Sequence, residues 1–200
     1  MLEILFSPIL FICSLFMPKN KNIICFGSWY GKKFSDNSKN LFIEMNSNTN
    51  YTVFWITKSK EVYEELKNKN YPVEYSFSIK GLLIQLKART FIHTVNARDF
   101  QFGVITPKNI TFQLWHGSPI KKIGFDVEVN FVKAIIRLIR AKTTDIVSYV
   151  VSPSAFWDPV YATAFKVNKE QIIRNGYPRC DDLFLPIESS TVFEVAYLPT

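Results

Sequence analysis

The sequence predicts an α/β protein with a doubly wound parallel sheet and helices on both of its faces. After Pro18, apolar runs rich in β-branched and aromatic residues alternate with stretches in which apolar residues recur every three or four positions. Strands that alternate with helices are joined by crossover connections, which make the strands parallel. Hydrophobic residues make up 48% of the 200, so the chain can bury one core of good size.

Six short segments are expected to form the strands of this sheet. The segment 51–57, YTVFWIT, has the composition that strands favour, because β-branched and aromatic side chains pack well on a pleated surface. The expected strands are 22–27, 51–57, 90–95, 110–115, 145–151 and 171–174. Their alternation with helices predicts a Rossmann-like order of elements.

Five segments between the strands are expected to be helices. Ser59, followed by Glu61 and Val62, is a typical helix start, and Ser35 or Asp36 is in position to cap the first helix. The expected helices are 36–45, 59–69, 79–88, 128–141 and 154–165. In the helix at 128–141 an apolar stripe lies opposite a basic one, with Val132, Ile135, Ile136 and Ile139 against Lys133, Arg137 and Arg140.

Residues 1–17, MLEILFSPILFICSLFM, are strongly apolar, are interrupted by Pro8, and are followed by Lys19 and Lys21. The stretch is shorter than the roughly 20 residues of a spanning helix, and it lacks the basic start and small-residue cleavage site of a secretory signal. Two interpretations remain: a buried first helix, or a segment in the membrane interface whose lysines reach lipid phosphates. We favour the second and expect residues 1–18 to associate with a membrane surface.

The net charge of +7 is compatible with nucleic acid, an anionic membrane surface or phosphorylated substrates as partners. The basic residues are scattered in pairs, such as Lys32-Lys33 and Lys121-Lys122, and do not gather in one block. A nucleic-acid-binding domain concentrates its positive charge on one face or along one helix. We therefore do not expect nucleic acid as a partner.

The cysteines and histidines are few and widely spaced. Cys13, Cys25 and Cys180 form no CxxC or Cys/His pattern, and their simplest interpretation is free thiols in a reducing compartment. With His93 and His116 as the two histidines, a zinc site is not expected. His93 lies within the apolar run TFIHTV, where a hydrogen-bonded core histidine is the simplest interpretation.

The segment 113–126, QLWHGSPIKKIGFD, carries the polar chemistry of the chain. His116 follows an apolar run directly and is flanked by Gly117 and Pro119, so it lies where a strand leaves the sheet. Histidine takes or gives a proton near neutral pH, and the nearby lysines suit a phosphate-bearing partner. These considerations alone support a functional and a structural role equally. The loop 27–33 is either a flexible connection with two solvated lysines or an acceptor or phosphate contact at the carboxyl edge of the sheet.

Four elements of the sequence resemble one enzyme family. WHGSPIKKIGFD at 115–126 resembles the signature of the CDP-glycerol glycerophosphotransferases, whose usual form is WHGTPLKK followed by a glycine and an acidic residue. DNSK at 36–39, GYPRCD at 176–181 and YLPT at 197–200 resemble further family elements in the family's order. Ser118 in place of threonine and Ile120 in place of leucine are mild departures.

The resemblance implies a GT-B-like fold of two domains with the active site between them. It implies transfer of glycerol phosphate from CDP-glycerol, or of a related polyol phosphate, to a hydroxyl of a lipid-linked acceptor or growing teichoic-acid-like polymer, with release of CMP. By this resemblance, residues 19–168 form a Rossmann-like acceptor-side domain, and 169–200 begin a truncated nucleotide-binding domain. The protein is expected to lie peripherally on the cytoplasmic face of the membrane.

The resemblance also assigns roles to particular residues. His116 is the expected catalytic base, because an imidazole can accept the proton of an attacking hydroxyl. The residues expected to contact acceptor or phosphate are Gly117, Ser118, Lys121, Lys122, Asp126 and Arg179. No cofactor is expected, and the family's second catalytic histidine would lie beyond Thr200. The alternative is a non-catalytic, membrane-associated remnant or interaction module that keeps the same fold.

Overall fold

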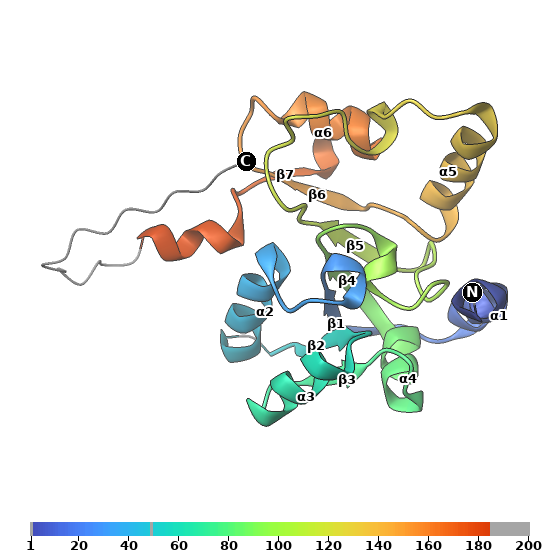
Figure 1. Ribbon diagram of the computed structural model, residues 1–200, viewed down its shortest axis with the longest axis vertical. Coiled ribbons are helices and arrows are strands. Elements are labelled where there is room, and N and C mark those ends of the chain that lie inside the picture. Colours follow the sequence, from blue (N-terminus) through green and yellow to red (C-terminus); the bar gives the residue numbers. More distant parts are fainter. Residues whose placement is uncertain (1, 49, 185–200) are drawn as a thin grey trace, which may run out of the picture.

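A computed structural model describes residues 2–48 and 50–184, which contain a seven-stranded sheet with helices on both faces (Figure 1). All six strand pairings are parallel, and the order is β3-β2-β1-β4-β5-β6-β7. The strands are β1 (Asn20–Gly27), β2 (Thr52–Thr57), β3 (Val73–Tyr75), β4 (Ala88–His93), β5 (Ile110–Gln113), β6 (Tyr149–Ser152) and β7 (Ile172–Arg174). This order reverses between β1 and β4, as in a doubly wound fold, and confirms the predicted fold class.

Six α-helices connect or precede the strands. They are α1 (Leu2–Phe16), α2 (Asp36–Asn48), α3 (Lys60–Asn68), α4 (Ile79–Lys87), α5 (Phe131–Thr143) and α6 (Asp158–Phe165). Short 3-10 turns are η1 (Trp29–Gly31), η2 (Ala97–Asp99), η3 (Gly124–Asp126), η4 (Lys169–Gln171) and η5 (Pro178–Phe184). The helix start predicted at Ser59 is present, because its side chain accepts a hydrogen bond from the backbone N–H of Val62.

Two apolar clusters fill the two sides of the central strands. Phe26 and Trp55 pack with Phe42 of α2 in one cluster, whereas Cys25 and Phe91 lie in the other cluster with residues of α4. Because neighbouring residues of a strand point to opposite faces, Cys25 and Phe26 belong to different clusters. The Cys25 thiol is fully buried, and burial raises its pKa, so it is an unreactive core thiol.

Three differences from the predicted elements have local causes. β3 was not predicted, because its sequence VEY carries a glutamate and follows Pro72, whereas the equally short β7 begins with two isoleucines. β6 begins at Tyr149 instead of 145, since the Asp145 carboxylate accepts a hydrogen bond from the backbone N–H of Ala97. The helix expected from 154 begins at Asp158, with proline at its first turn.

The predicted end of the first domain, at residue 168, lies before the last strand of the sheet. β7 pairs with β6 through Ile172 to Arg174, so these residues continue the same sheet. The domain boundary predicted at residue 168 stays a prediction, and β7 joins the sheet formed by the residues before it. The YxPT-like element at 197–200 lies outside the described residues.

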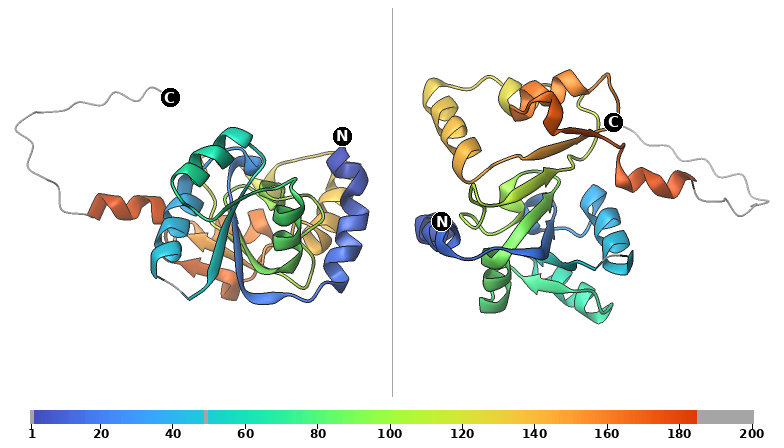
Figure 2. Two further views of the ribbon diagram at one scale, coloured as in Figure 1. Left: turned by 90° about the horizontal axis from the view of Figure 1, so that it is seen from below. Right: turned by 180° about the vertical axis from the view of Figure 1, so that it is seen from behind.

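The helix α1 packs on the domain with one face and exposes the other. The hydroxyl of its buried Ser14 donates to the carbonyl oxygen of Val104, while Ile9 is 58% and Phe16 82% exposed. The helix is therefore buried on one face only, and its association with a membrane stays a prediction. Within the described part of the chain, we find no helix with both the length and the apolar character needed to span a bilayer. Figure 2 shows α1 at the periphery of the domain, away from α2 and α3.

Lys19, one of two lysines expected to reach lipid phosphates, is instead tied to the protein. Its Nζ donates to Ser14 Oγ at 2.7 Å and to the Leu86 carbonyl oxygen at 2.8 Å. Burial, with the nearby cation of Lys108, lowers the Lys19 pKa to about 8. Lys21 is exposed, so it remains available to an anionic surface.

Candidate active site

The candidate site lies at the carboxyl edge of the sheet, beside the point where the strand order reverses. Three neighbouring strands contribute to it: β1 leads into Trp29, β4 ends at His93, and β5 leads into Trp115 and His116. The Gln113 side chain fixes the segment that follows β5, since it donates to the Val95 carbonyl oxygen and accepts from the backbone N–H of Trp115. The edge is where doubly wound sheets place their ligands.

His116 is held between two tryptophan rings. Its ring centroid lies 4.2 Å from that of Trp115, in a stacked arrangement, and 5.1 Å from that of Trp29, which is tilted by 35°. Trp29 adopts a positive φ of 47° in the turn after β1, and Trp115 one of 53° after β5. Non-glycine residues rarely adopt this conformation, so both turns are specialised to place these rings.

The charge state of His116 suits proton acceptance. Half-burial lowers its pKa below the usual 6.5; the carboxylate of Asp36 opposes this shift, and the guanidinium of Arg179 adds to it. The imidazole is therefore neutral at pH 7. A neutral imidazole beside a substrate hydroxyl can take its proton.

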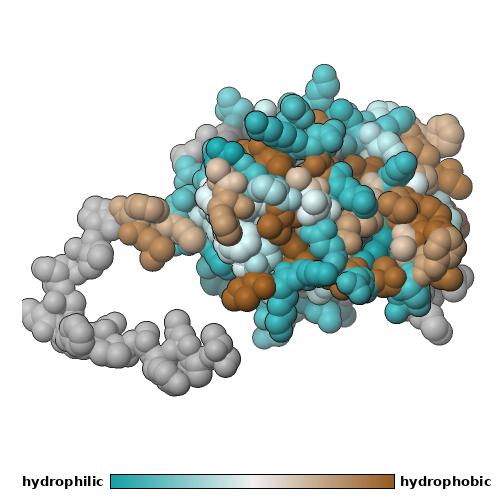
Figure 3. Space-filling view, turned by 90° about the horizontal axis from the view of Figure 1, so that it is seen from above, coloured by the Kyte–Doolittle hydropathy of each residue, from teal (hydrophilic) through white to brown (hydrophobic). Residues whose placement is uncertain are grey.

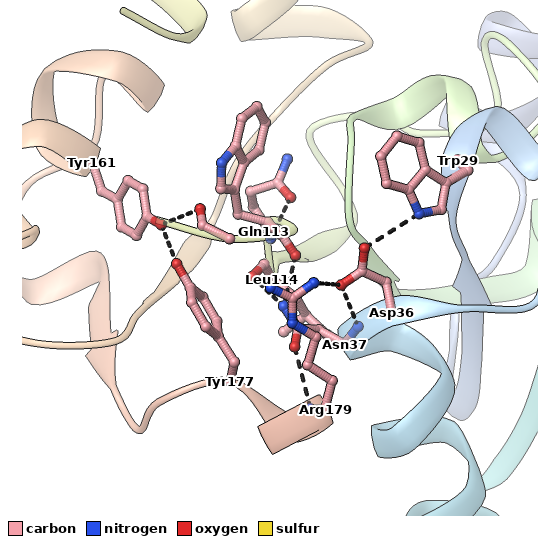
Figure 4. A network of polar contacts seen from close by, with 10 residues as sticks. Trp29, Asp36, Asn37, Gln113, Leu114, Tyr161, Tyr177 and Arg179 are labelled. Carbon is pink, nitrogen blue, oxygen red and sulfur yellow. Dashed lines mark hydrogen bonds and ion pairs between the residues drawn. The ribbon is translucent and has the colours of Figure 1, made fainter. Parts of the chain in front are cut away.

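Asn37, at the start of α2, anchors the loop that carries His116. Its fully buried side chain donates from Nδ2 to the carbonyl oxygens of Leu114 (3.3 Å) and Trp115 (2.8 Å). Its Oδ1 accepts from the backbone N–H of Arg179 at 3.3 Å (Figure 4). One side chain thus joins α2, the loop that carries His116, and η5.

Asp36, next to Asn37, joins two further parts of the site. Its carboxylate accepts from Trp29 Nε1 at 3.3 Å and from Arg179 Nη1 at 3.0 Å (Figure 4). The tilted ring of Trp29 beside His116 and the cation that lowers the His116 pKa are therefore fixed by the same carboxylate. This side chain is largely buried, which strengthens its interaction with Arg179 relative to a fully exposed pair.

A pair of tyrosines holds the other side of the loop. Tyr161 of α6 donates from its hydroxyl to the Gly117 carbonyl oxygen at 3.3 Å. Its oxygen lies 2.5 Å from the Tyr177 hydroxyl, which consequently donates to it (Figure 4). Gly117 has a φ of +151°, a conformation that disfavours any residue with a side chain.

The comparison with known proteins fits this arrangement. The model of the CDP-glycerol:poly(glycerophosphate) glycerophosphotransferase family matches residues 9–191. This chain belongs to that family. It is 31% identical over 169 residues to a teichoic acid glycerol-phosphate transferase of Staphylococcus aureus, covering 82% of this chain and 42% of that protein. It is 28% identical over 189 residues to a teichoic acid poly(glycerol phosphate) polymerase of Bacillus subtilis, covering 87% and 24%.

The structural comparison confirms the fold of this glycerophosphotransferase-family chain. The wall teichoic acid polymerase TagF matches with a TM-score of 0.67 and 22% sequence identity, over 86% of this chain and 43% of TagF. The match supports the predicted GT-B-like amino-terminal domain. The chain spans less than half the length of each of these relatives.

The structure brings only some of the predicted site residues together. Gly117 and Arg179 lie in the network around His116, and Ser118 follows on the exposed part of the loop. Lys122 instead pairs with Glu128 at 3.3 Å on the surface. Lys121, Lys122 and Asp126 line a separate surface depression of about 490 Å³, beside Trp157 and Val160. Their substrate-binding roles stay predictions.

Asp126 has a structural partner in the fold. Its carboxylate accepts from the Thr163 hydroxyl at 2.8 Å, which ties η3 to α6. Gly124 lies at the same junction, with a φ of +51°. A Cβ added to it would overlap the carbonyl oxygen of Ala164. This glycine of the family signature thus permits close packing of η3 on α6.

Sequence reasoning did not assign roles to the residues that hold His116 in place. Asn37 was noticed as part of DNSK and Trp29 as part of the loop 27–33, but neither pattern says what the side chain touches. Tyr161 gave no signal, because a tyrosine on an apolar helix face is typical of a core. The contacts are between residues distant in sequence, so periodicity cannot reveal them.

His93 is a buried histidine of the core rather than a ligand. It is 1% exposed, and neither ring nitrogen has a hydrogen-bond partner within residues 2–48 and 50–184, contrary to the expected hydrogen-bonded state. Burial lowers its pKa to about 4, so the ring is neutral. Among the described residues, no three His, Cys, Asp or Glu side chains are grouped closely enough to hold a metal ion.

Proposed function

We propose that this chain is the acceptor-side half of a CDP-glycerol glycerophosphotransferase and that His116 is its general base. The observation that carries the proposal is a neutral imidazole fixed between two indole rings at the carboxyl edge of the sheet. The names of its relatives, a teichoic acid glycerol-phosphate transferase and poly(glycerol phosphate) polymerases, support the substrate class.

In the proposed reaction, a hydroxyl oxygen of the acceptor attacks the phosphorus of the glycerol phosphate group. His116 accepts the hydroxyl proton as the new P–O bond forms, and the bond to the CMP oxygen breaks. A hydroxyl is a poor nucleophile at neutral pH, so removing its proton in the transition state accelerates attack. The Trp29 and Trp115 rings and the Asn37 anchor supply orientation, which contributes a further large share of catalysis.

The test is release of CMP from CDP-glycerol in the presence of a lipid acceptor. Residues 1–200 are assayed alone and joined to the remaining portion of the Staphylococcus aureus relative. We expect little or no turnover from the chain alone and transfer by the joined protein. His116→Ala should abolish CMP release while the circular dichroism spectrum is unchanged, and Lys87→Ala on the opposite edge of the sheet serves as the control. Near-normal turnover by His116→Ala refutes the base assignment.

We also propose that α1 rests on a membrane, with the domain peripheral to its cytoplasmic face. The exposed apolar side chains of Ile9, Ile12 and Phe16 support this, since burial of such surface favours the bilayer interface. Ile9→Asp with Ile12→Asp should abolish flotation with anionic vesicles, because both side chains point away from the core. Leu183→Asp, an exposed apolar residue on η5, is the control; unchanged flotation of the double variant contradicts the proposal.

A further inference from the structure

A cavity of about 610 Å³ lies beside the His116 loop, at the carboxyl edge of the sheet. Its walls come from η1, the residues after β4 and β5, α5, and the end of α6. This volume falls within the range of roughly 300–1,000 Å³ that small-molecule sites occupy. Figure 3 looks onto the end of the molecule formed by α5 and α6 and shows hydrophilic and hydrophobic side chains mixed at its surface.

The lining of the cavity is strongly cationic. It includes Arg98, Arg137, Arg140, Lys142 and Lys166, against Asp145 as the one carboxylate among its described lining residues. Asp145 lies 3.9 Å from Arg140, so it offsets part of one of these charges. The remaining excess of positive charge favours a ligand with more than one negative charge.

Aromatic rings line the same cavity. Tyr30, Trp115, Phe125 and Phe165 contribute to its walls, and Trp115 meets Phe165 edge to face with centroids 5.2 Å apart. Rings suit the C–H faces of a polyol, whereas the cations suit phosphate. The ligand that fits both kinds of wall alternates neutral polyol with anionic phosphate. A purely apolar ligand would leave the cations without counter-charge.

The cavity adjoins the loop of His116 through two of its lining residues, Tyr30 and Trp115, while His116 itself is not a lining residue. Trp115 lines the cavity and also stacks on the imidazole of His116. Tyr30 lines the cavity as well and directly follows Trp29, the second ring beside the imidazole. A general base must lie within hydrogen-bond reach of the hydroxyl that it deprotonates. The molecule that carries this hydroxyl must therefore extend from His116 into an adjoining space.

We infer that this cavity binds the polyol-phosphate end of the acceptor, with its phosphodiester groups against Arg98, Lys142 and their cationic neighbours. The inference rests on the proposed function, because it takes His116 as the base. It adds the location of the acceptor and the residues that select it. Arg98, in η2, and Lys142, in α5, approach from different elements and are both exposed, so their charges can be reversed without disturbing the core.

The test measures binding of a synthetic glycerol phosphate trimer to residues 1–200 by isothermal titration calorimetry, with no donor present. Arg98→Glu with Lys142→Glu should weaken binding about tenfold or more, the effect of losing one charge-assisted hydrogen bond. Lys87→Glu, at the opposite edge of the sheet, should change the affinity less than twofold. Ala141→Trp, which fills the cavity without changing charge, should also abolish binding. Circular dichroism checks the fold of each variant.

Several results would overturn the inference. The affinity for the trimer could be unchanged in both cavity variants, or Lys87→Glu could reduce it equally. Inorganic phosphate could bind as tightly as the trimer, or CDP-glycerol could displace the trimer. Binding of the trimer requires no donor and no proton transfer. A failure of the trimer to bind therefore refutes only the cavity assignment, whereas the CMP-release assay tests the proposed function.

Discussion

Replacing Asn37 with alanine is expected to destabilise the domain through the loop that carries His116. The amide donates to the carbonyl oxygens of Leu114 and Trp115 and accepts from the backbone N–H of Arg179. The contact at 2.8 Å is a strong hydrogen bond, and the two at 3.3 Å are weaker. Losing the stronger bond leaves a buried carbonyl unpaired, which costs roughly 1–3 kcal/mol, and the two weaker bonds together cost about 1–2 kcal/mol.

The magnitude follows from these contacts. The better helix propensity of alanine returns about 0.5 kcal/mol, which leaves a net loss of about 2–4 kcal/mol in the free energy of unfolding. For a chain of this size each 1 kcal/mol lowers Tm by about 2–4 °C, so a decrease of roughly 5–15 °C is expected. Urea unfolding followed by circular dichroism measures the free energy, and a thermal scan measures Tm.

Two further variants make the experiment decisive. Asn46→Ala removes the same side chain from an exposed position of α2 and should change the free energy of unfolding by less than about 0.5 kcal/mol. Asn37→Asp keeps an acceptor for Arg179 but turns a carboxylate oxygen toward two carbonyl oxygens, so it should destabilise at least as much as Asn37→Ala. If Asn37→Ala behaves like Asn46→Ala, or if Asn37→Asp is tolerated, the anchoring role is refuted.

Further predictions concern the charge of His116 and the packing of η3. Asp36→Asn removes a carboxylate that raises the His116 pKa, so this pKa should fall further. Arg179→Gln removes a cation that lowers the His116 pKa, so this pKa should rise. An NMR titration of the imidazole protons reports both shifts, and shifts in one direction would contradict the electrostatic account. Gly124→Ala combines a positive φ with overlap on a carbonyl oxygen of α6 and should cost about 2–5 kcal/mol. Gly176→Ala has a positive φ with open space and should cost about 1 kcal/mol; equal losses in urea unfolding would show that overlap does not matter.

The fold could be predicted because its signals are local. The strand β2 and the helix α3 each carry their own composition and periodicity, and the residues after β5 carry an exit turn that places His116 at the correct edge. β3 was missed because its sequence VEY lacks the run of β-branched residues that marked the equally short β7. Local patterns fix which elements form, and alternation between strands and helices fixes that the sheet is parallel.

The construction of the site could not be predicted from local patterns. The resemblance to the family pointed to His116 and Arg179, but it also grouped Lys122 and Asp126 with them. In the structure these two side chains contact Glu128 and Thr163 instead. A shared motif shows that residues belong to one loop, whereas only the packing of α6 and η3 determines which of them turn toward the imidazole.

The two rings that enclose His116 come from either side of β4, one after β1 and the other after β5. The contacts that hold Trp115 and Arg179 in place join residues 77, 78 and 143 positions apart along the chain. Closing such long loops is slow, because chain entropy is lost before any contact forms. We therefore expect the rings and charged groups around His116 to assemble among the last events of folding. In a partly folded chain, the histidine would lack the surroundings that set its pKa and its orientation.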